Sequence, residues 1–177
     1  GGMLRYGIPD YRLPPDVLDA EIERILDLGV ELQLETRIGV DVTLEELRQR
    51  HDVLYLGLGA QKGRGLDIPG EAGGSVWTGT DYLSRVNTGE AVDLGRRVVV
   101  VGGGNTAVDA ARTARRTGAD VTMVYRRSRA EMPAIAQEVD EALEEGVTLV
   151  LQAAPVRLER VDGALRTLTA CRIELGP

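Results

Sequence analysis

The sequence predicts an α/β fold in which a parallel sheet carries helices on both faces and a β-hairpin or meander follows at the C-terminal end. From Arg97 onward, apolar strand patterns alternate with helical patterns in the order β-α-β-α-β, which is typical of a right-handed, doubly wound parallel sheet. Near the end, Asp162-Gly163 lies between two alternating runs, and this dipeptide strongly favours a two-residue hairpin turn.

Glycines and β-branched runs delimit the elements of this C-terminal part. Residues 98–101 are four consecutive valines, a run typical of a strand buried on both faces of a parallel sheet. A glycine turn leads into a helix over about 105–117, which Gly118 closes. The next predicted elements are a strand at 120–125, a helix at 133–145 closed by Gly146, a strand at 147–151 and hairpin strands at 156–161 and 164–175.

The first half of the chain predicts shorter elements. Pro15 and the spacing of the apolar residues after it predict a helix that ends at Gly29. Thr43 and Glu46 form a capping box for a short second helix. We also expect strands at 30–34 and 52–56, a glycine-rich connection between two structural units at 61–77 and a short helix at 81–86.

Composition and charge exclude several classes of function. No apolar run among the 177 residues approaches the ~18–20 that a bilayer requires. The 21 basic and 28 acidic side chains give a formal charge of −7, which argues against a nucleic-acid or anionic-membrane binder. The single cysteine, Cys171, excludes an internal disulfide and a Cys-x-x-Cys centre and favours a reducing, cytoplasmic compartment; the single histidine, His51, argues against a metal site.

The turn after the first strand of the predicted sheet fits the pattern G-x-G-x-x-A with the residues GGGNTA at 102–107. Gly102 permits the tight turn, Gly104 lets a pyrophosphate approach the backbone, and Ala107 lets the helix lie close to the sheet. The helix N-terminus adds unpaired N–H groups and a partial positive charge. Because the flanking strands and helix have the expected spacing, we predict a Rossmann-like dinucleotide site; a turn that needs glycine for backbone reasons alone is the alternative.

The end of the second strand indicates which dinucleotide binds. A site for NAD usually carries Asp or Glu about 20 residues beyond the glycine turn. Here the chain reads Tyr125-Arg126-Arg127-Ser128-Arg129, without an acid. Guanidinium groups suit a 2′-phosphate, and Tyr125 or an arginine could stack on adenine. We therefore favour NADP, with Arg126 and Arg127 as main ligands and Arg129 as a third; the alternative is a solvated basic strand end.

Other polar or small residues have simpler interpretations. The G-x-G at 57–59 is not followed by a predicted helix, so we interpret it as a strand end leading into a crossover, and retain Gly57 and Gly59 as candidate cofactor-binding residues. Asp109 and Glu131 are acidic residues near the candidate pocket, and Asp109 is interpreted as a solvated or locally paired carboxylate. His51 is interpreted as a capping or surface residue and Cys171 as a small core or sheet residue.

The chain resembles the pyridine-nucleotide-dependent flavoprotein family typified by the small (β) subunit of glutamate synthase, with related members such as the flavin-containing half of dihydropyrimidine dehydrogenase. The likeness covers essentially the whole chain. Four segments carry it: GGMLRYGIPDYRLP at 1–14, DVLYLGLGAQKGRGLDIPGE at 52–71, VVVVGGGNTAVDAARTARRTGADVTMVYRRS at 98–128 and EMPA at 131–134.

This resemblance implies an NADP-binding domain inserted into an FAD-binding domain. Residues 1–76 would then be a partial FAD-binding domain, without its N-terminal FAD fingerprint, and the crossover linker; residues 77–177 would be the NAD(P)-binding domain. The part that resembles 1–14 lies near the flavin. We therefore expect a fragment that does not hold FAD by itself, whose partners are the remaining FAD-domain segments and an iron–sulfur or large-subunit-like protein.

In the complete protein, the resemblance implies that hydride passes from NADPH to FAD and that electrons continue to iron–sulfur centres or a partner subunit. We expect no catalytic side chain, because the cofactors carry the chemistry, and an isolated chain that is inactive. The alternatives are a docking module without turnover and a self-standing NAD(P)-dependent dehydrogenase, which would need an acid or base side chain. The candidate cofactor-binding residues are Gly102, Gly103, Gly104, Asn105, Thr106, Ala107, Tyr125, Arg126, Arg127, Gly57 and Gly59.

Overall fold

The computed structural model describes residues 2–60 and 62–174. It divides into two compact units: unit 1 contains Gly1–Leu13 and Lys62–Pro177, and unit 2 contains Pro14–Gln61. The domain boundary expected between residues 76 and 77 stays a prediction. No helix in the described ranges is long and apolar enough to cross a membrane.

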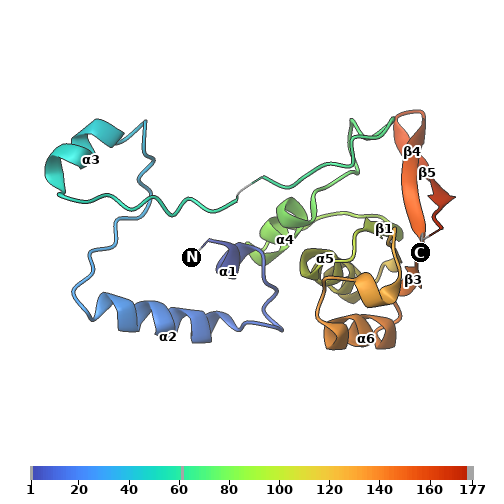
Figure 1. Ribbon diagram of the computed structural model, residues 1–177, viewed down its shortest axis with the longest axis horizontal. Coiled ribbons are helices and arrows are strands. Elements are labelled where there is room, and N and C mark those ends of the chain that lie inside the picture. The colour runs from blue at the N-terminus through green and yellow to red at the C-terminus, as the bar shows by residue number, and fades with distance from the viewer. Residues whose placement is uncertain (1, 61, 175–177) are drawn as a thin grey trace. The chain divides into compact units, whose positions relative to one another are not determined.

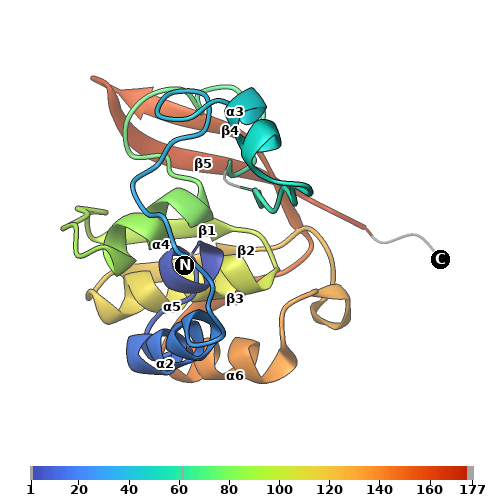
Figure 2. The ribbon, with the colours of Figure 1, turned by 90° about the vertical axis from the view of Figure 1, so that its left-hand side faces the viewer.

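Unit 1 is built around a three-stranded parallel sheet in the order β1-β2-β3 (strands β1 and β3 are labelled in Figure 1, and all three in Figure 2). The strands are β1 (Arg97–Val101), β2 (Asp120–Val124) and β3 (Thr148–Val150). Helix α5 (Asn105–Arg116) connects β1 to β2, and α6 (Ala136–Glu144) connects β2 to β3. The predicted β-α-β-α-β order and the Rossmann-like fold are therefore confirmed.

The core of unit 1 lies on one face of this sheet. Side chains of alternate strand residues, Val98, Val100, Val121, Met123 and Leu149, pack there against α4 (Gly79–Asn87), α5 and α6. The helices share this face because each strand is added in the same direction by a right-handed crossover. Figure 2 shows α5 and α6 along one side of the strands.

The opposite face of the sheet is only partly covered by the described residues. Val99 is 47% exposed and Val150 is 40% exposed. The prediction that residues 98–101 are buried on both faces is therefore wrong for β1. Among the described residues, this strand pairs with β2 alone, and α4, α5 and α6 all cover the face that bears Val98 and Val100.

The predicted hairpin is confirmed. Strands β4 (Ala153–Val161) and β5 (Ala164–Arg172) are antiparallel. Asp162 and Gly163 form the turn with φ values of 51° and 77°, the left-handed conformations that a two-residue type I′ turn requires. Cys171 lies exposed on β5, so it is a sheet residue rather than a core residue.

The N-terminal segment is held to α4 in unit 1. Helix α1 (Met3–Tyr6) is a single turn, and the Asn87 side chain donates hydrogen bonds to the carbonyl oxygens of Tyr6 at 2.9 Å and Ile8 at 3.0 Å. Both carbonyls belong to a segment without strand partners, and the amide of Asn87 supplies the missing donors.

Unit 2 contains helices α2 (Pro15–Leu26) and α3 (Leu44–Arg50), as expected. The capping box is present, because Glu46 N–H donates to Thr43 Oγ1 at 3.1 Å and Thr43 N–H donates to Glu46 Oε2 at 2.8 Å. His51 is the C-cap residue of α3, which agrees with the sequence-based interpretation.

The strands predicted at 30–34 and 52–56 are wrong. Neither range forms a strand, and apart from the partly buried Leu54 their residues are exposed. A strand requires a neighbour to pair its backbone N–H and C=O groups. In the described part of unit 2, the only bridge outside named strands joins Ile38 to Val42. The apolar residues of 30–34 and 52–56 therefore have no neighbouring strand to pair with.

Leu83 on α4 is the most completely buried leucine side chain of the core, at 0% exposure. We expect Leu83→Ala to lower the free energy of unfolding by about 2–5 kcal/mol, because it removes apolar contacts and leaves a cavity. Urea denaturation measures this loss. Leu4→Ala, at a residue that is 50% exposed in the same unit, should cost less than about 1 kcal/mol; equal losses would contradict the placement of α4 in the core.

Candidate functional site

Two turns leave the sheet of unit 1 at the same edge. Val101 and Val124, the last residues of β1 and β2, are paired in register. The glycine turn, Gly102–Gly104, follows β1, and the basic turn, Tyr125–Arg129, follows β2. The N–H of Gly102 donates to the carbonyl oxygen of Val124 at 3.0 Å, so the two turns begin side by side.

The space around each glycine of the glycine turn differs, so a side chain would have a different effect at each position. Gly102 has a φ of 143°, which L side chains rarely adopt, and a Cβ there would lie 3.0 Å from the Cβ of Ala107. A Cβ on the buried Gly103 would lie 2.6 Å from the ring of Tyr125. A Cβ on Gly104 would meet only the Cγ of Pro133 at 3.9 Å, so open space lies beside this residue.

The N-terminus of α5 opens directly onto the glycine turn. The carbonyl oxygen of Gly104 accepts from Ala107 N–H at 2.9 Å and from Val108 N–H at 3.1 Å. The N–H groups of Asn105 and Thr106 precede these bonds and have no partner within the helix. Such N–H groups at a helix N-terminus suit a phosphate or another anion.

The side chain of Asn105 forms a hydrogen bond to the segment that precedes α6. Its Oδ1 accepts a hydrogen bond from the N–H of Ile135 at 3.0 Å, and the N–H of Ala134 donates to the carbonyl oxygen of Gly103 at 3.1 Å. Two hydrogen bonds therefore connect the segment before α6 to the glycine turn and to the first residue of α5. Sequence reasoning assigned Asn105 to the pyrophosphate alone and missed this contact.

The basic turn presents its two candidate arginines to solvent. Arg126 and Arg127 are exposed, and Nε of Arg127 lies 4.0 Å from Oε1 of Glu131. Arg129, the weaker candidate, forms an ion pair with Asp140. Its guanidinium is therefore already engaged with α6.

Tyr125 lies between the two turns. Its ring is the group that a Cβ on Gly103 would meet first, and its hydroxyl donates to the carbonyl oxygen of Glu131 at 2.8 Å. The residue predicted to stack on adenine thus packs against the glycine turn and anchors the turn after β2. Its role toward a nucleotide stays a prediction.

The carboxylate of Glu131 organises the basic turn. Its Oε2 accepts from Ser128 Oγ at 2.9 Å and from Ser128 N–H at 3.1 Å. These hydrogen bonds, first the one from the Ser128 side chain, lower the pKa of Glu131 below its ordinary value. Glu131 is therefore ionised at neutral pH and acts as an acceptor only.

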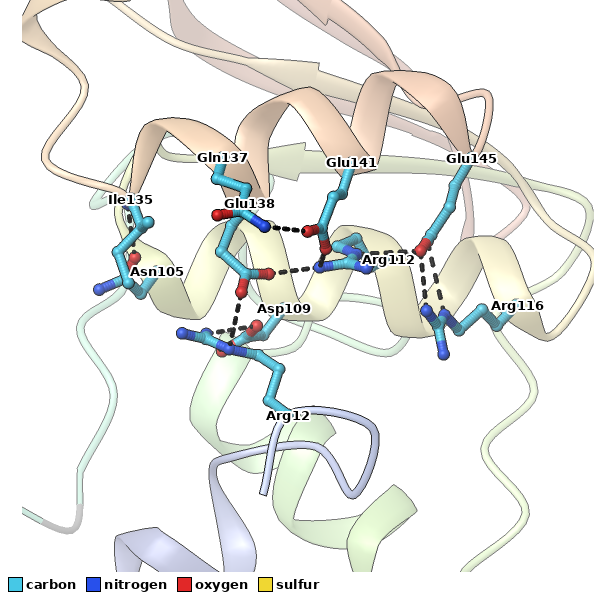
Figure 3. Close-up of polar contacts among 10 residues, drawn as sticks. All are labelled: Arg12, Asn105, Asp109, Arg112, Arg116, Ile135, Gln137, Glu138, Glu141 and Glu145. Atoms are coloured by element: carbon cyan, nitrogen blue, oxygen red, sulfur yellow. Dashed lines mark hydrogen bonds and ion pairs between the residues drawn. The ribbon is translucent and has the colours of Figure 1, made fainter. Parts of the chain in front are cut away.

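An ion-pair cluster joins α5 and α6 (Figure 3). Arg112 is 4% exposed and pairs with three carboxylates. Glu138 and Glu141 belong to α6, the latter at 2.8 Å, and Glu145, also at 2.8 Å, is the C-cap residue of α6. Arg116 reaches the same oxygen of Glu145 at 2.8 Å. The spacing of these residues places all of them on facing sides of the two helices.

Arg12 brings the N-terminal segment into this cluster. Its Nη1 donates to both oxygens of Asp109, at 2.8 and 2.7 Å, and its Nε lies 3.4 Å from Glu138 (Figure 3). Asp109 is 3% exposed and its partner lies 97 positions away in the sequence, so the interpretation as a solvated or locally paired carboxylate is wrong. Burial raises the pKa of Asp109, although the bond from Arg12 acts in the opposite direction.

Tyr11 packs against the two arginines of the cluster. The guanidinium carbon of Arg116 lies 3.8 Å from the centre of the Tyr11 ring, and that of Arg112 lies 4.8 Å from it. Burial, followed by the negative charge of Asp109, raises the pKa of Tyr11 to about 12. The phenol is therefore neutral at physiological pH, and the contact with the two arginines is a cation–π interaction.

The remaining candidates, Gly57 and Gly59, belong to unit 2. Both are exposed and lie outside any helix or strand, and Gly59 has a φ of 66°. Because no described helix follows them directly, they do not form a helix-terminus anion site like the one at Gly104. Their part in cofactor binding stays a prediction.

Unit 1 contains parallel strands connected by helices, with a glycine turn at the N-terminus of α5. These features define a Rossmann-type, dinucleotide-binding fold. The family model of pyridine nucleotide-disulphide oxidoreductases matches residues 12–174. The chain belongs to this family.

Curated relatives agree with the resemblance to the glutamate synthase small subunit. The chain is 45% identical over 162 residues to the NADPH-Fe(3+) oxidoreductase subunit beta of Geobacter sulfurreducens, covering 89% of the chain and 24% of that protein. It is 38% identical to the glutamate synthase [NADPH] small chain of Azospirillum brasilense, covering 99% of the chain and 39% of that protein. The chain thus spans well under half the length of these relatives.

Among solved structures, FprA from Mycobacterium tuberculosis has the same fold. The TM-score is 0.80 at 17% sequence identity, and the match covers 99% of this chain and 55% of FprA.

Arg12 supplies the two hydrogen bonds that offset the burial of the Asp109 charge. We expect Arg12→Ala to lower the free energy of unfolding by about 2–4 kcal/mol, since it leaves a buried carboxylate without its partner. A double-mutant cycle with Asp109→Ala, measured by urea denaturation, should give a coupling of about 1–3 kcal/mol. Arg157→Ala, which breaks an exposed pair with Glu159, should cost less than about 1 kcal/mol; additive effects at Arg12 and Asp109 would refute the pairing.

Glu145 makes part of the stability depend on pH. Burial opposes its charge, but hydrogen bonds from Arg116 and Arg112 hold its pKa below the ordinary value of 4.5. A lowered pKa means that the stabilisation is complete above about pH 4.5 and is lost as the pH falls through the folded-state value. We expect Glu145→Gln to lower the unfolding free energy by about 1–3 kcal/mol at pH 7 and by much less at pH 3. Urea titrations at both pH values test this, and a difference that persists at pH 3 would contradict it.

Proposed function

We propose that this chain is the NADP(H)-binding part of a flavin-dependent oxidoreductase similar to the small subunit of glutamate synthase. One observation carries the proposal: the glycine turn and the basic turn leave paired strands in register at the same sheet edge. A dinucleotide that spans this edge meets an anion-binding helix terminus and two arginines together.

The groups present suit NADP at both of its charged parts. The N–H groups of Asn105 and Thr106 would hold the pyrophosphate, with the open side of Gly104 admitting it to the backbone. Arg126 and Arg127 would bind the 2′-phosphate, since guanidinium groups form charge-assisted, often bidentate, bonds with phosphate.

The chain's part in the reaction is to bind and orient the nucleotide. Bound NADPH supplies a hydride from its nicotinamide ring, and the cofactor itself carries that chemistry. The backbone N–H groups and Arg126 and Arg127 set the position of the phosphates, and through them the direction in which the nicotinamide end extends.

FAD, the hydride acceptor in this proposal, is assigned to the complete protein. Gly57 and Gly59 do not supply a pyrophosphate site by themselves, and the relatives extend well beyond the part that this chain matches. The relatives' names, "subunit beta" and "small chain", support a partner subunit that receives the electrons onward, directly or through iron–sulfur centres. We place the protein in the cytoplasm, since its only cysteine, Cys171, is free.

Calorimetric titration with NADPH and, separately, NADH tests the nucleotide assignment. We expect tighter binding of NADPH. Arg126→Ala should weaken NADPH binding about 10- to 100-fold, the equivalent of one lost charged hydrogen bond, and leave NADH binding nearly unchanged.

Arg166→Ala provides a matched control, because Arg166 is an exposed arginine on β5. It changes the net charge equally and should leave both affinities unchanged. Equal affinities for the two nucleotides in the wild-type protein would reject the 2′-phosphate site and favour NAD.

A further inference from the structure

We propose that Glu131 is a positioning residue that sets the preference for a 2′-phosphorylated nucleotide by holding the basic turn in a binding-ready shape. The inference rests on the proposed NADP site and adds a residue that does not itself touch the nucleotide. It concerns how Arg126 and Arg127 are ordered, rather than which groups bind the phosphate.

Glu131 is bonded to the residues on both sides of the two arginines. Tyr125, immediately before them, donates its hydroxyl to the carbonyl oxygen of Glu131 at 2.8 Å. Ser128, immediately after them, donates both its Oγ and its N–H to Oε2 of Glu131, at 2.9 and 3.1 Å. One residue therefore closes the turn from which both arginine side chains extend.

The backbone of the turn is also fixed from its other side. The N–H of Gln152 donates to the carbonyl oxygen of Arg127 at 3.2 Å, and the N–H of Ala153 donates to that of Tyr125 at 3.1 Å. Between these anchors and Glu131, the side chains of Arg126 and Arg127 are exposed. Exposed arginines on an ordered backbone lose less conformational entropy on binding a phosphate than arginines on a loose loop.

The second carboxylate oxygen of Glu131, Oε1, lies near Arg127 but too far away for a hydrogen bond. The distance from Oε1 to Nε of Arg127 is 4.0 Å, much longer than the 2.7–2.9 Å of a charge-assisted hydrogen bond. Glu131 thus attracts the guanidinium toward one side but leaves its donors available to a phosphate. Both hydrogen bonds from Ser128 are accepted by the other oxygen, Oε2.

The segment after Glu131 connects this turn to the other half of the site. Within the next four residues, Ala134 N–H is bonded to Gly103 and Ile135 N–H to Asn105. The ring of Tyr125 also packs against Gly103. Glu131 therefore helps to fix the separation between the groups for the pyrophosphate and those for the 2′-phosphate.

Three variants separate this role from general stability, with NADPH and NADH titrated against each by calorimetry. Glu131→Ala removes the acceptor for Ser128 and should weaken NADPH binding about tenfold while changing NADH binding less than about twofold. Glu131→Gln keeps an amide oxygen as the acceptor and should retain most of the preference for NADPH. Ser128→Ala removes one of the two donors and should give an intermediate loss, so the test does not depend on the Glu131→Ala protein.

Glu144→Ala is the matched control, because Glu144 is an exposed glutamate at the end of α6 and its removal changes the net charge equally. It should leave both affinities unchanged. Equal weakening of NADPH and NADH by Glu131→Ala, or no weakening, would overturn the inference, as would a Glu131→Gln protein that behaves like Glu131→Ala. A wild-type protein without preference for NADPH contradicts the proposed function itself, whereas a preference that survives Glu131→Ala contradicts this inference alone.

Discussion

The parallel register between β1 and β2 is the constraint on which the candidate site depends. Val101 lies opposite Val124, so the residues that follow each strand emerge at the same level of the sheet. The bond from Gly102 N–H to the Val124 carbonyl oxygen carries this register one residue beyond β1. A slip of one residue would reverse the faces of all the side chains of a strand and separate Gly103 from the ring of Tyr125.

The ion-pair cluster fixes the layer of helices behind that sheet edge. An apolar contact between α5 and α6 could slide by a turn at modest cost, whereas Arg112 is 4% exposed and must find its carboxylates on α6. Leaving one of these charges unpaired would cost several kcal/mol. We interpret the cluster as a device for the alignment of α5, whose N-terminus forms part of the glycine-turn site, rather than as a large net source of stability.

The sequence predicts best what neighbouring residues determine. The glycine turn, the Thr43–Glu46 capping box and the Asp162-Gly163 hairpin each depend on contacts within a few residues, and each is present. The strands at 30–34 and 52–56 fail because a strand needs a partner that its own residues do not specify. Arg12 and Asp109 are 97 positions apart, so no local pattern could have paired them.

The same distinction applies at the basic turn, whose role toward a nucleotide stays a prediction. Composition identifies Arg126 and Arg127 as the groups with the right charge, but charge alone does not distinguish a phosphate site from a solvated strand end. The structure adds the hydrogen bonds that order the backbone beneath these arginines, which involve the side chains of Tyr125, Ser128 and Glu131. The aromatic residue at this position predicts a surface for stacking on adenine. In the folded chain, the ring of Tyr125 also packs against Gly103 and its hydroxyl donates to Glu131, so this residue connects the two turns between which a nucleotide would lie.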